Sequence, residues 1–121
     1  MCSVNHEKLV VWQKAMDLVV NVYELSRTLP NNEQFGLISQ LRRAAVSVPS
    51  NIAEGNARIS KKEYIRFLSI ARGSVAEVET QLEICERLNY LEAHEIFASI
   101  KLCEEINKII SALIRNLNSK L

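Results

Sequence analysis

The sequence predicts an all-α protein that forms a single domain over residues 1–121, folded as an antiparallel up-down-up-down four-helix bundle. Four long segments carry apolar residues at alternating spacings of three and four, which is the repeat of one helix face. The connections between these segments are short, so each helix must run back along the one before it. Only three glycines and two prolines occur in the chain, which is too few for the turns of a β protein.

The first helix is expected over residues 7–29, and two apolar stripes run along it. One stripe consists of Ala15, Leu18, Val22, Leu25 and Leu29, and the other of Trp12, Met16, Val19 and Tyr23. At about 100° per residue the two stripes lie about 110° apart, so the apolar arc is wider than one bundle core needs. The residues Pro30-Asn31-Asn32 then end the helix and turn the chain.

The second helix is expected over residues 33–57 and contains a proline inside its repeat. Its apolar positions on both sides of that proline are Leu41, Ala45, Val48 and Ile52. Because the spacing continues past Pro49, we expect the helix to kink there instead of ending.

The third and fourth helices have regular apolar stripes. Ser60 opens the third helix with a capping box that Glu63 completes. The stripe of the third helix is Tyr64, Leu68, Ala71, Val75, Val78, Leu82 and Cys85. The fourth helix is expected over residues 92–119, after the short link Asn89-Tyr90-Leu91, and its stripe is Ile96, Ile100, Cys103, Ile106, Ile110, Leu113 and Leu117.

The net charge of +1 hides an uneven distribution of charge along the chain. From Arg42 to Arg72 there are seven basic residues against two acidic ones, a net charge of +5. From Glu77 to Glu105 there are eight glutamates against two basic residues, a net charge of −6. These segments are either two solvated helix faces or, for the basic one, a binding site for a polyanion.

The cysteines and the hydropathy indicate a soluble protein of a reducing compartment. Cys2, Cys85 and Cys103 are odd in number and have no metal-ligand spacing, and the last two fall on apolar stripes. We therefore expect Cys85 and Cys103 to be buried thiols in a cytoplasmic protein. There is no run of 18 apolar residues, so no membrane association is expected, and no metal or cofactor is implied.

A second stripe of the third helix is a candidate subunit interface. It consists of the small or hydroxylated residues Ser69, Gly73, Ala76 and Thr80. A glycine inside a helix costs about 1 kcal/mol relative to alanine, so a contact should compensate for it. That contact is either a second subunit or, within the chain, a bulky side chain such as Trp12. Together with the wide apolar arc of the first helix, the stripe favours a homo-oligomer.

Three further residues are candidates for the same subunit interface. Asn51 could satisfy a carbonyl group that Pro49 leaves without a donor, and Glu54 could meet a basic residue across an interface. A solvated pair is the alternative for both. Arg72 could form a salt bridge, internal or between subunits, with a glutamate of the acidic segment.

These motifs together resemble the four-helix-bundle proteins encoded by intervening sequences of bacterial 23S rRNA genes, over essentially the whole chain. The residues that carry the resemblance are 11–18 (Val-Trp-Gln-Lys-Ala-Met-Asp-Leu), 40–44 with Ser47, 51–55 (Asn-Ile-Ala-Glu-Gly), 67–68, 71–74, Glu77, Glu79 and Leu82. The chain is also similar to the accessory variability proteins of diversity-generating retroelements. The resemblance implies a barrel-like homopentamer without enzymatic activity, and for the retroelement relatives it implies a strongly basic oligomer that binds RNA and a reverse transcriptase.

The leading functional hypothesis is a non-enzymatic, homo-oligomeric binding module, pentameric if it follows the resemblance, whose ligand is structured RNA. The candidate nucleic-acid-binding residues are Arg42, Arg43, Arg58, Lys61, Lys62 and Arg66. They would contact phosphates and read backbone and shape. The alternative is a protein-interaction scaffold without a nucleic-acid ligand, in which the +5 and −6 segments pair between subunits and the ring binds a protein partner.

An enzyme is the least favoured class, and no catalytic residue is predicted. His94 has Leu91 three positions before it, so the Glu-x-x-His pattern of di-iron bundles is absent. Gly55 is a lone glycine and forms no phosphate-binding loop. No base can be assigned to any of the serines.

Overall fold

The computed structural model describes residues 5–119, and it is built from four α-helices. The helices are α1 (Val10–Ser26), α2 (Leu37–Asn56), α3 (Lys61–Arg87) and α4 (Ala93–Asn118), with single 3-10 turns η1 (His6–Lys8) and η2 (Asn31–Glu33). Residues 5–119 contain no β-strand. The predicted all-α class and the four helices are therefore confirmed.

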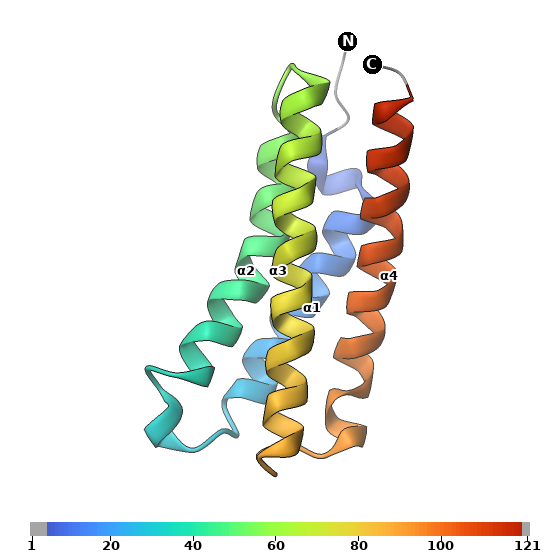
Figure 1. The fold of residues 1–121 in the computed structure, drawn as a ribbon. Helices are drawn as coiled ribbons and strands as arrows, with labels where there is room; N and C mark the ends of the chain where they lie inside the picture. The colour runs from blue at the N-terminus through green and yellow to red at the C-terminus, as the bar shows by residue number, and fades with distance from the viewer. Residues whose placement is uncertain (1–4, 120–121) are drawn as a thin grey trace.

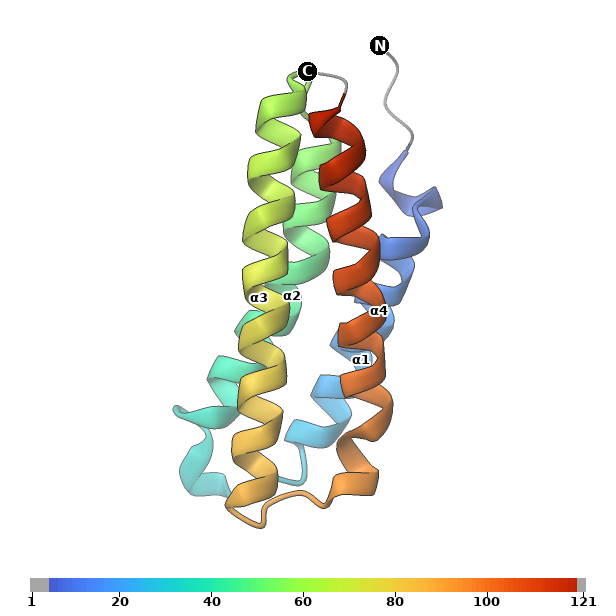
Figure 2. The same ribbon diagram turned by 45° about the vertical axis from the view of Figure 1, so that its right-hand side comes forward.

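The four helices pack as a bundle in which each helix has two neighbours. α1 contacts α2 and α4, and α3 contacts the same two helices, with the most extensive contact between α2 and α3. In Figures 1 and 2 the chain reverses its direction along the long axis at each connection. The start of α1 and the end of α4 consequently lie at the same end of the bundle (Figure 1).

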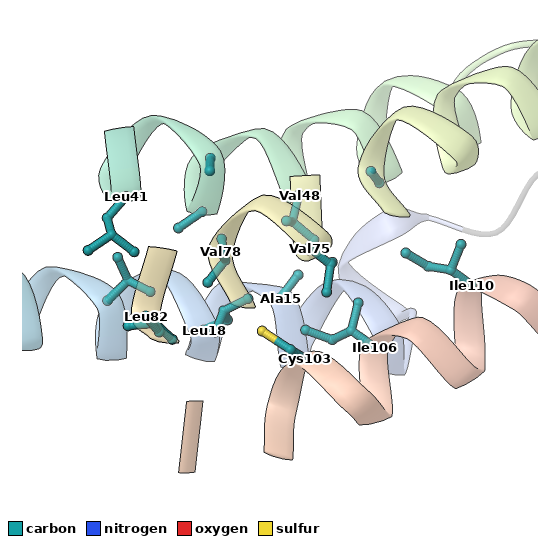
Figure 3. Close-up of a cluster of buried hydrophobic side chains, with 14 of the residues drawn as sticks. Ala15, Leu18, Leu41, Val48, Val75, Val78, Leu82, Cys103, Ile106 and Ile110 are labelled. Carbon is teal, nitrogen blue, oxygen red and sulfur yellow. The ribbon is translucent and has the colours of Figure 1, made fainter. Parts of the chain in front are cut away.

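The core lies between the helices and takes apolar side chains from all four. Leu18, Val48, Val78 and Ile106, one from each helix, are fully buried and lie in one cluster (Figure 3). Fully burying a side chain of this size contributes about 1.5–3 kcal/mol. The apolar stripes therefore identify the buried face of each helix. In the part of the chain that the structure describes, no helix combines the length and the apolar character needed to cross a membrane.

The first helix is shorter than predicted and uses only one of its two stripes for the core. It begins at Val10, because Leu9 is extended and η1 precedes it, and it ends at Ser26. The stripe that contains Ala15 and Leu18 is buried, whereas Met16, in the other stripe, is 40% exposed. Part of the apolar arc of α1 therefore lies outside the core.

The second helix begins four residues later than predicted but continues through its proline. η2 occupies Asn31–Glu33, and α2 then runs from Leu37 to Asn56 with Pro49 buried inside it. An α-helical Pro49 leaves the carbonyl of Ala45 without its donor. The Asn51 side chain, however, donates to the carbonyl of Ser47 (2.8 Å) and not to that of Ala45.

The termini of α3 and α4 differ from the predicted details in two places. Ser60 caps α3 by accepting a hydrogen bond from the Glu63 N–H (3.3 Å), but the Glu63 carboxylate turns to Arg66, so the reciprocal half of the capping box is absent. Near its end α4 buries Ile114, while Leu113 of the predicted stripe is half-buried. A straight helix drifts about 20° per heptad from a 3.5-residue repeat, which accounts for this change of face.

One carboxylate joins two connections at the end of the bundle where α2 begins. The Glu33 side chain accepts a hydrogen bond from the Leu37 N–H (3.3 Å) and another from the Tyr90 hydroxyl (3.0 Å). The second bond raises the pKa of Tyr90 because Glu33 stabilises its protonated hydroxyl. Asn89 precedes Tyr90 with a φ of 62°, a left-handed conformation that asparagine tolerates at a helix end.

Gly55 allows α2 and α3 to approach closely. A Cβ atom at this position would lie 2.8 Å from the Cβ of Phe67 and 3.0 Å from Cδ1 of Tyr64. Both distances are below ordinary van der Waals contact, so only glycine fits without a shift of α3. Gly55, which as a lone glycine carries no phosphate-binding motif, has this packing role instead.

Replacing Gly55 with alanine should lower the free energy of unfolding by about 1–3 kcal/mol, because the new methyl group overlaps Phe67. Chemical denaturation followed by circular dichroism measures the change. Gly73→Ala is the matched control, since no heavy atom lies within 4 Å of a Cβ there, and it should not destabilise the fold. Equal effects of the two substitutions would contradict the packing role of Gly55.

Cys85 and Cys103 are free thiols with no exposed surface, as predicted. Burial raises the pKa of Cys85 to about 11 and that of Cys103 to about 12. The pairing of Cys2 lies outside the described residues.

At pH 7.5 iodoacetamide should leave both buried thiols unmodified in the native protein and alkylate them after unfolding in guanidinium, because only the thiolate reacts. Peptide mass spectrometry measures this, and rapid alkylation of the native protein would contradict the burial.

Candidate functional site

Four of the six predicted nucleic-acid-binding residues come together where α2 ends and α3 begins. We call this group, Arg58, Lys61, Lys62 and Arg66, the basic end. Residues 58–66 hold these four basic residues and one acidic residue, a net charge of +3. The close approach at Gly55 and the Ser60 cap place the last turn of α2 beside the first turns of α3.

An aromatic ring organises two of the cations at the basic end. The guanidinium carbons of Arg58 and Arg66 lie 5.0 Å and 4.5 Å from the centroid of the Phe67 ring, within the range of cation–π contacts. Phe67 also packs against α2 at Gly55. One ring therefore holds a guanidinium from the α2–α3 connection and another from α3 at a defined place on the surface.

The same two arginines are paired with nearby glutamates, one in α2 and one in α3. Arg58 pairs with Glu54 (2.6 Å) and Arg66 with Glu63 (3.2 Å). The hydrogen bond from Arg66 lowers the pKa of Glu63 and raises that of Arg66. All four side chains are about half exposed, and exposed pairs of this kind stabilise a protein little. The arginines can therefore exchange a glutamate for another anion at small cost.

Arg42 and Arg43 are adjacent in sequence, but their side chains lie against different parts of the structure. Arg42 turns toward α1, where its Nε donates to Ser26 Oγ (2.8 Å) and its guanidinium lies 4.6 Å from the Tyr23 ring centroid. Arg42 is thus tied to the packing of α1 on α2 and lies apart from the basic end. Arg43 is exposed and lines a separate pocket between α2 and α3.

The small-residue stripe of α3 faces outward. Ser69, Gly73, Ala76 and Thr80 are all exposed. No heavy atom lies within 4 Å of a Cβ built at Gly73, so Gly73 does not make room for Trp12 or any other described side chain. Arg72 is also exposed and contacts Ser111 Oγ of α4 (3.4 Å), and within residues 5–119 it forms no ion pair with a glutamate.

Asn51 and Glu54, the other candidates for the subunit interface, both have partners within the chain. Asn51 donates to Ser47 Oγ (2.9 Å), which in turn lies 2.8 Å from Ser74 Oγ of α3. Glu54 is the partner of Arg58. Asn51 therefore belongs to a polar contact between α2 and α3, and Glu54 lies beside the basic end as the partner of Arg58.

The unused apolar arc of α1 forms a groove with α2. The groove has a volume of about 390 Å³ and is lined by Trp12, Met16 and Val19 of α1 and by Val46, Pro49 and Ala53 of α2. Trp12 makes an edge-to-face contact with His6, with ring centroids 5.1 Å apart. The wide apolar arc of α1 predicted an apolar surface outside the core. The sequence did not predict that residues of α2 would line the other side of the groove, because only one apolar stripe was identified on that helix.

An acidic groove of about 330 Å³ lies between α3 and α4. Glu79, Glu83, Glu86 and Glu104 line it together with Phe97, whose side chain is 65% exposed. Burial raises the pKa of Glu79, and the negative charges of Glu104 and Glu83 raise it further. Among the described residues no group of three or more His, Cys, Asp or Glu side chains could hold a metal ion.

Phe67 is the main site residue that the sequence analysis missed. It is not part of the apolar stripe of α3, and it directly follows Arg66 in the most basic part of the chain. An aromatic residue next to a cation cluster and off the core stripe was the available signal. Phe35, exposed in the turn before α2, is a second aromatic residue off the core stripes, although no basic residue adjoins it in the sequence.

Comparisons with known proteins identify the family of the chain. No curated protein matches it. A solved structure from Bacteroides thetaiotaomicron, described as a protein of unknown function from the S23 ribosomal protein family, is similar in fold with a TM-score of 0.80. The two sequences are 28% identical, and the match covers 87% of this chain and 98% of the other. Residues 7–112 match the family of 23S rRNA-intervening sequence proteins, so the chain belongs to that family.

Proposed function

We propose that this protein is a non-enzymatic binding module that assembles into a ring of identical antiparallel bundles and binds structured RNA through its basic end. The observation that carries the proposal is the basic end, where Lys61 and Lys62 lie in the same short segment as Arg58 and Arg66, whose guanidinium groups both contact the ring of Phe67. Cations of this kind bind phosphates, and the contacts position an RNA backbone without reading its sequence.

Two different exposed surfaces support assembly into a closed ring. One is the outward stripe of α3 around Gly73, and the other is the apolar groove between α1 and α2. An interface between two unlike surfaces repeats from subunit to subunit and closes into a ring if the rotation allows it. A subunit number of five is the expectation from the family resemblance.

A ring would strengthen RNA binding without any new contact. Each subunit carries one basic end, so the ring presents as many copies of it as it has subunits. Several weak phosphate-binding sites held together act as one site of higher avidity if the RNA can reach them simultaneously. This explains how a chain of net charge +1 could bind a polyanion through a patch of net charge +3.

A protein-interaction scaffold is the second candidate, and the acidic groove between α3 and α4 favours it. Four carboxylates surround the exposed ring of Phe97 there, and this combination suits a basic segment with an apolar side chain. The two candidates differ in whether RNA is bound at low salt.

RNA binding should be measurable by fluorescence anisotropy with a labelled stem-loop RNA across a salt series, with a Kd in the micromolar range or tighter at low salt. Changing Lys62 and Arg66 to glutamine should reduce the slope of log K against log salt by about one for each phosphate that the variant no longer neutralises. Lys101→Gln/Lys108→Gln, on exposed positions of α4, is the control with the same charge change. Undetectable binding at low salt would reject the RNA proposal and leave the scaffold.

Assembly should fail when the stripe of α3 is blocked. Gly73→Leu should convert the oligomer to monomers while far-ultraviolet circular dichroism stays unchanged, because the leucine points away from the core. Ala112→Leu, on an exposed position of α4, is the matched control and should assemble normally. Sedimentation velocity measures both, and a native mass for Gly73→Leu would exclude this stripe as the interface.

A further inference from the structure

A polar pocket between α2 and α3 has no role in the proposal above. It lies near the start of α2, has a volume of about 390 Å³, and is lined by residues that include Phe35, Gln40, Arg43, Ser47, Glu77 and Gln81. The volume falls in the range of sites for small organic ligands. Most of these residues are polar, whereas the groove between α1 and α2 is mainly apolar.

Two opposite charges line this pocket without neutralising each other. Arg43 comes from α2 and Glu77 from α3, and both are exposed. Within residues 5–119 neither side chain forms a hydrogen bond or an ion pair. The pocket therefore offers hydrogen-bond donors on one helix and acceptors on the other, with room for a ligand between them.

Gln81 supplies a buried polar group that lacks a partner. Its side chain is 8% exposed, its Nε2 reaches Gln40 Oε1 at only 3.4 Å, and its Oε1 accepts no hydrogen bond from any described residue. An unsatisfied buried acceptor is unfavourable, so the hydrogen bonding of this wall of the pocket is incomplete.

The neighbouring wall is fixed by hydrogen bonds within the chain. Ser47 Oγ lies 2.8 Å from Ser74 Oγ and accepts from Asn51 Nδ2 at 2.9 Å. These contacts hold α2 against α3 beside Arg43 and Glu77. The backbone positions that carry Arg43 and Glu77 are therefore fixed relative to each other, which lowers part of the entropic cost of binding.

An exposed aromatic ring lies at the same pocket. The Phe35 side chain is 93% exposed, in the turn that precedes α2. Exposed aromatic residues bind unpaired RNA bases by stacking, while polar groups nearby bond to the base edges. The pocket thus combines a stacking surface with donors and acceptors.

We infer that this pocket binds an unpaired guanine base of the RNA ligand, an inference that rests on the proposed function. Guanine has two adjacent donors, N1–H and the N2 amino group, which fit the Glu77 carboxylate. Its acceptors O6 and N7 fit the Arg43 guanidinium, which is a common specific contact to guanine. Adenine, cytosine and uracil lack the adjacent pair of imino and amino donors, so the carboxylate favours guanine.

The pocket and the basic end can act on one RNA molecule. Arg43, Ser47, Asn51 and Glu54 follow one another at spacings of four and three, so they share one face of α2, and Arg58 pairs with Glu54 from just beyond the end of that helix. Arg43 and Glu54 lie eleven positions apart, which is about 16 Å along the helix. Phosphate contacts at the basic end would position the RNA, and the pocket would select a base a few nucleotides away.

The test uses two labelled RNA hairpins with the same stem, one with guanosines and one with adenosines in the single-stranded loop. The native protein should bind the guanosine loop roughly 5- to 150-fold more tightly, the range expected for one bidentate base contact. Glu77→Gln keeps the size of the side chain and should remove most of this preference while leaving the affinity for the adenosine loop nearly unchanged. Arg43→Gln should also remove the preference.

The matched control is Glu83→Gln, which removes the same charge from the same helix at a position in the acidic groove. It should keep the preference for guanosine. Equal binding of the two hairpins by the native protein would overturn the assignment of the pocket and leave the proposed function standing. A change in the mass of the oligomer in Arg43→Gln or Glu77→Gln would also overturn it, because the pocket would then belong to a contact between copies.

Absence of binding to either hairpin would reject the proposed function, and the pocket then needs a separate measurement. Isothermal titration calorimetry with guanosine 5′-monophosphate supplies it. Binding that is lost in Glu77→Gln and kept in Glu83→Gln would support a guanine site without an RNA role. No heat of binding for the native protein would overturn the inference.

Discussion

The close contact of α2 and α3 at Gly55 is the constraint on which the rest of the structure depends. Because glycine has no Cβ, Tyr64 and Phe67 pack directly against the backbone of α2. This contact fixes the ring of Phe67 and, through it, the positions of Arg58 and Arg66. The same pair of helices encloses the polar pocket nearer the start of α2, so the packing of α2 on α3 underlies both the basic end and the pocket.

The apolar stripes predicted the four helices and most of the core. Buried positions recur with the repeat of the helix and carry apolar residues, so the repeat is visible in the sequence. The helix boundaries were less predictable. α2 begins at Leu37 because Glu33 accepts its N–H and Tyr90 holds Glu33, and a contact between residues so far apart leaves no local signal. The choice between the two stripes of α1 also depended on which one its neighbours cover.

The charged residues were predictable as a group but not one by one. A sequence gives the charge of Arg42 and Arg43 but not the side chains they meet, and only the packing of α1 on α2 places Tyr23 and Ser26 beside Arg42. Phe67 and Gln81 were missed for the same reason, since each gains its role from the other helix. Tertiary contacts thus divide one basic segment into a structural arginine, a pocket arginine and the basic end.

The double use of the Glu33 carboxylate has a consequence for motion. One oxygen is bonded to the start of α2 and the other to the link between α3 and α4, so the turn that carries Phe35 is fastened to the second connection at this end of the bundle. Phe35 is exposed, yet the backbone beneath it is not an independent flap. A displacement of this backbone would disturb the hydrogen bonds of Glu33 and therefore the α3–α4 link as well. We expect the two connections at this end to move together.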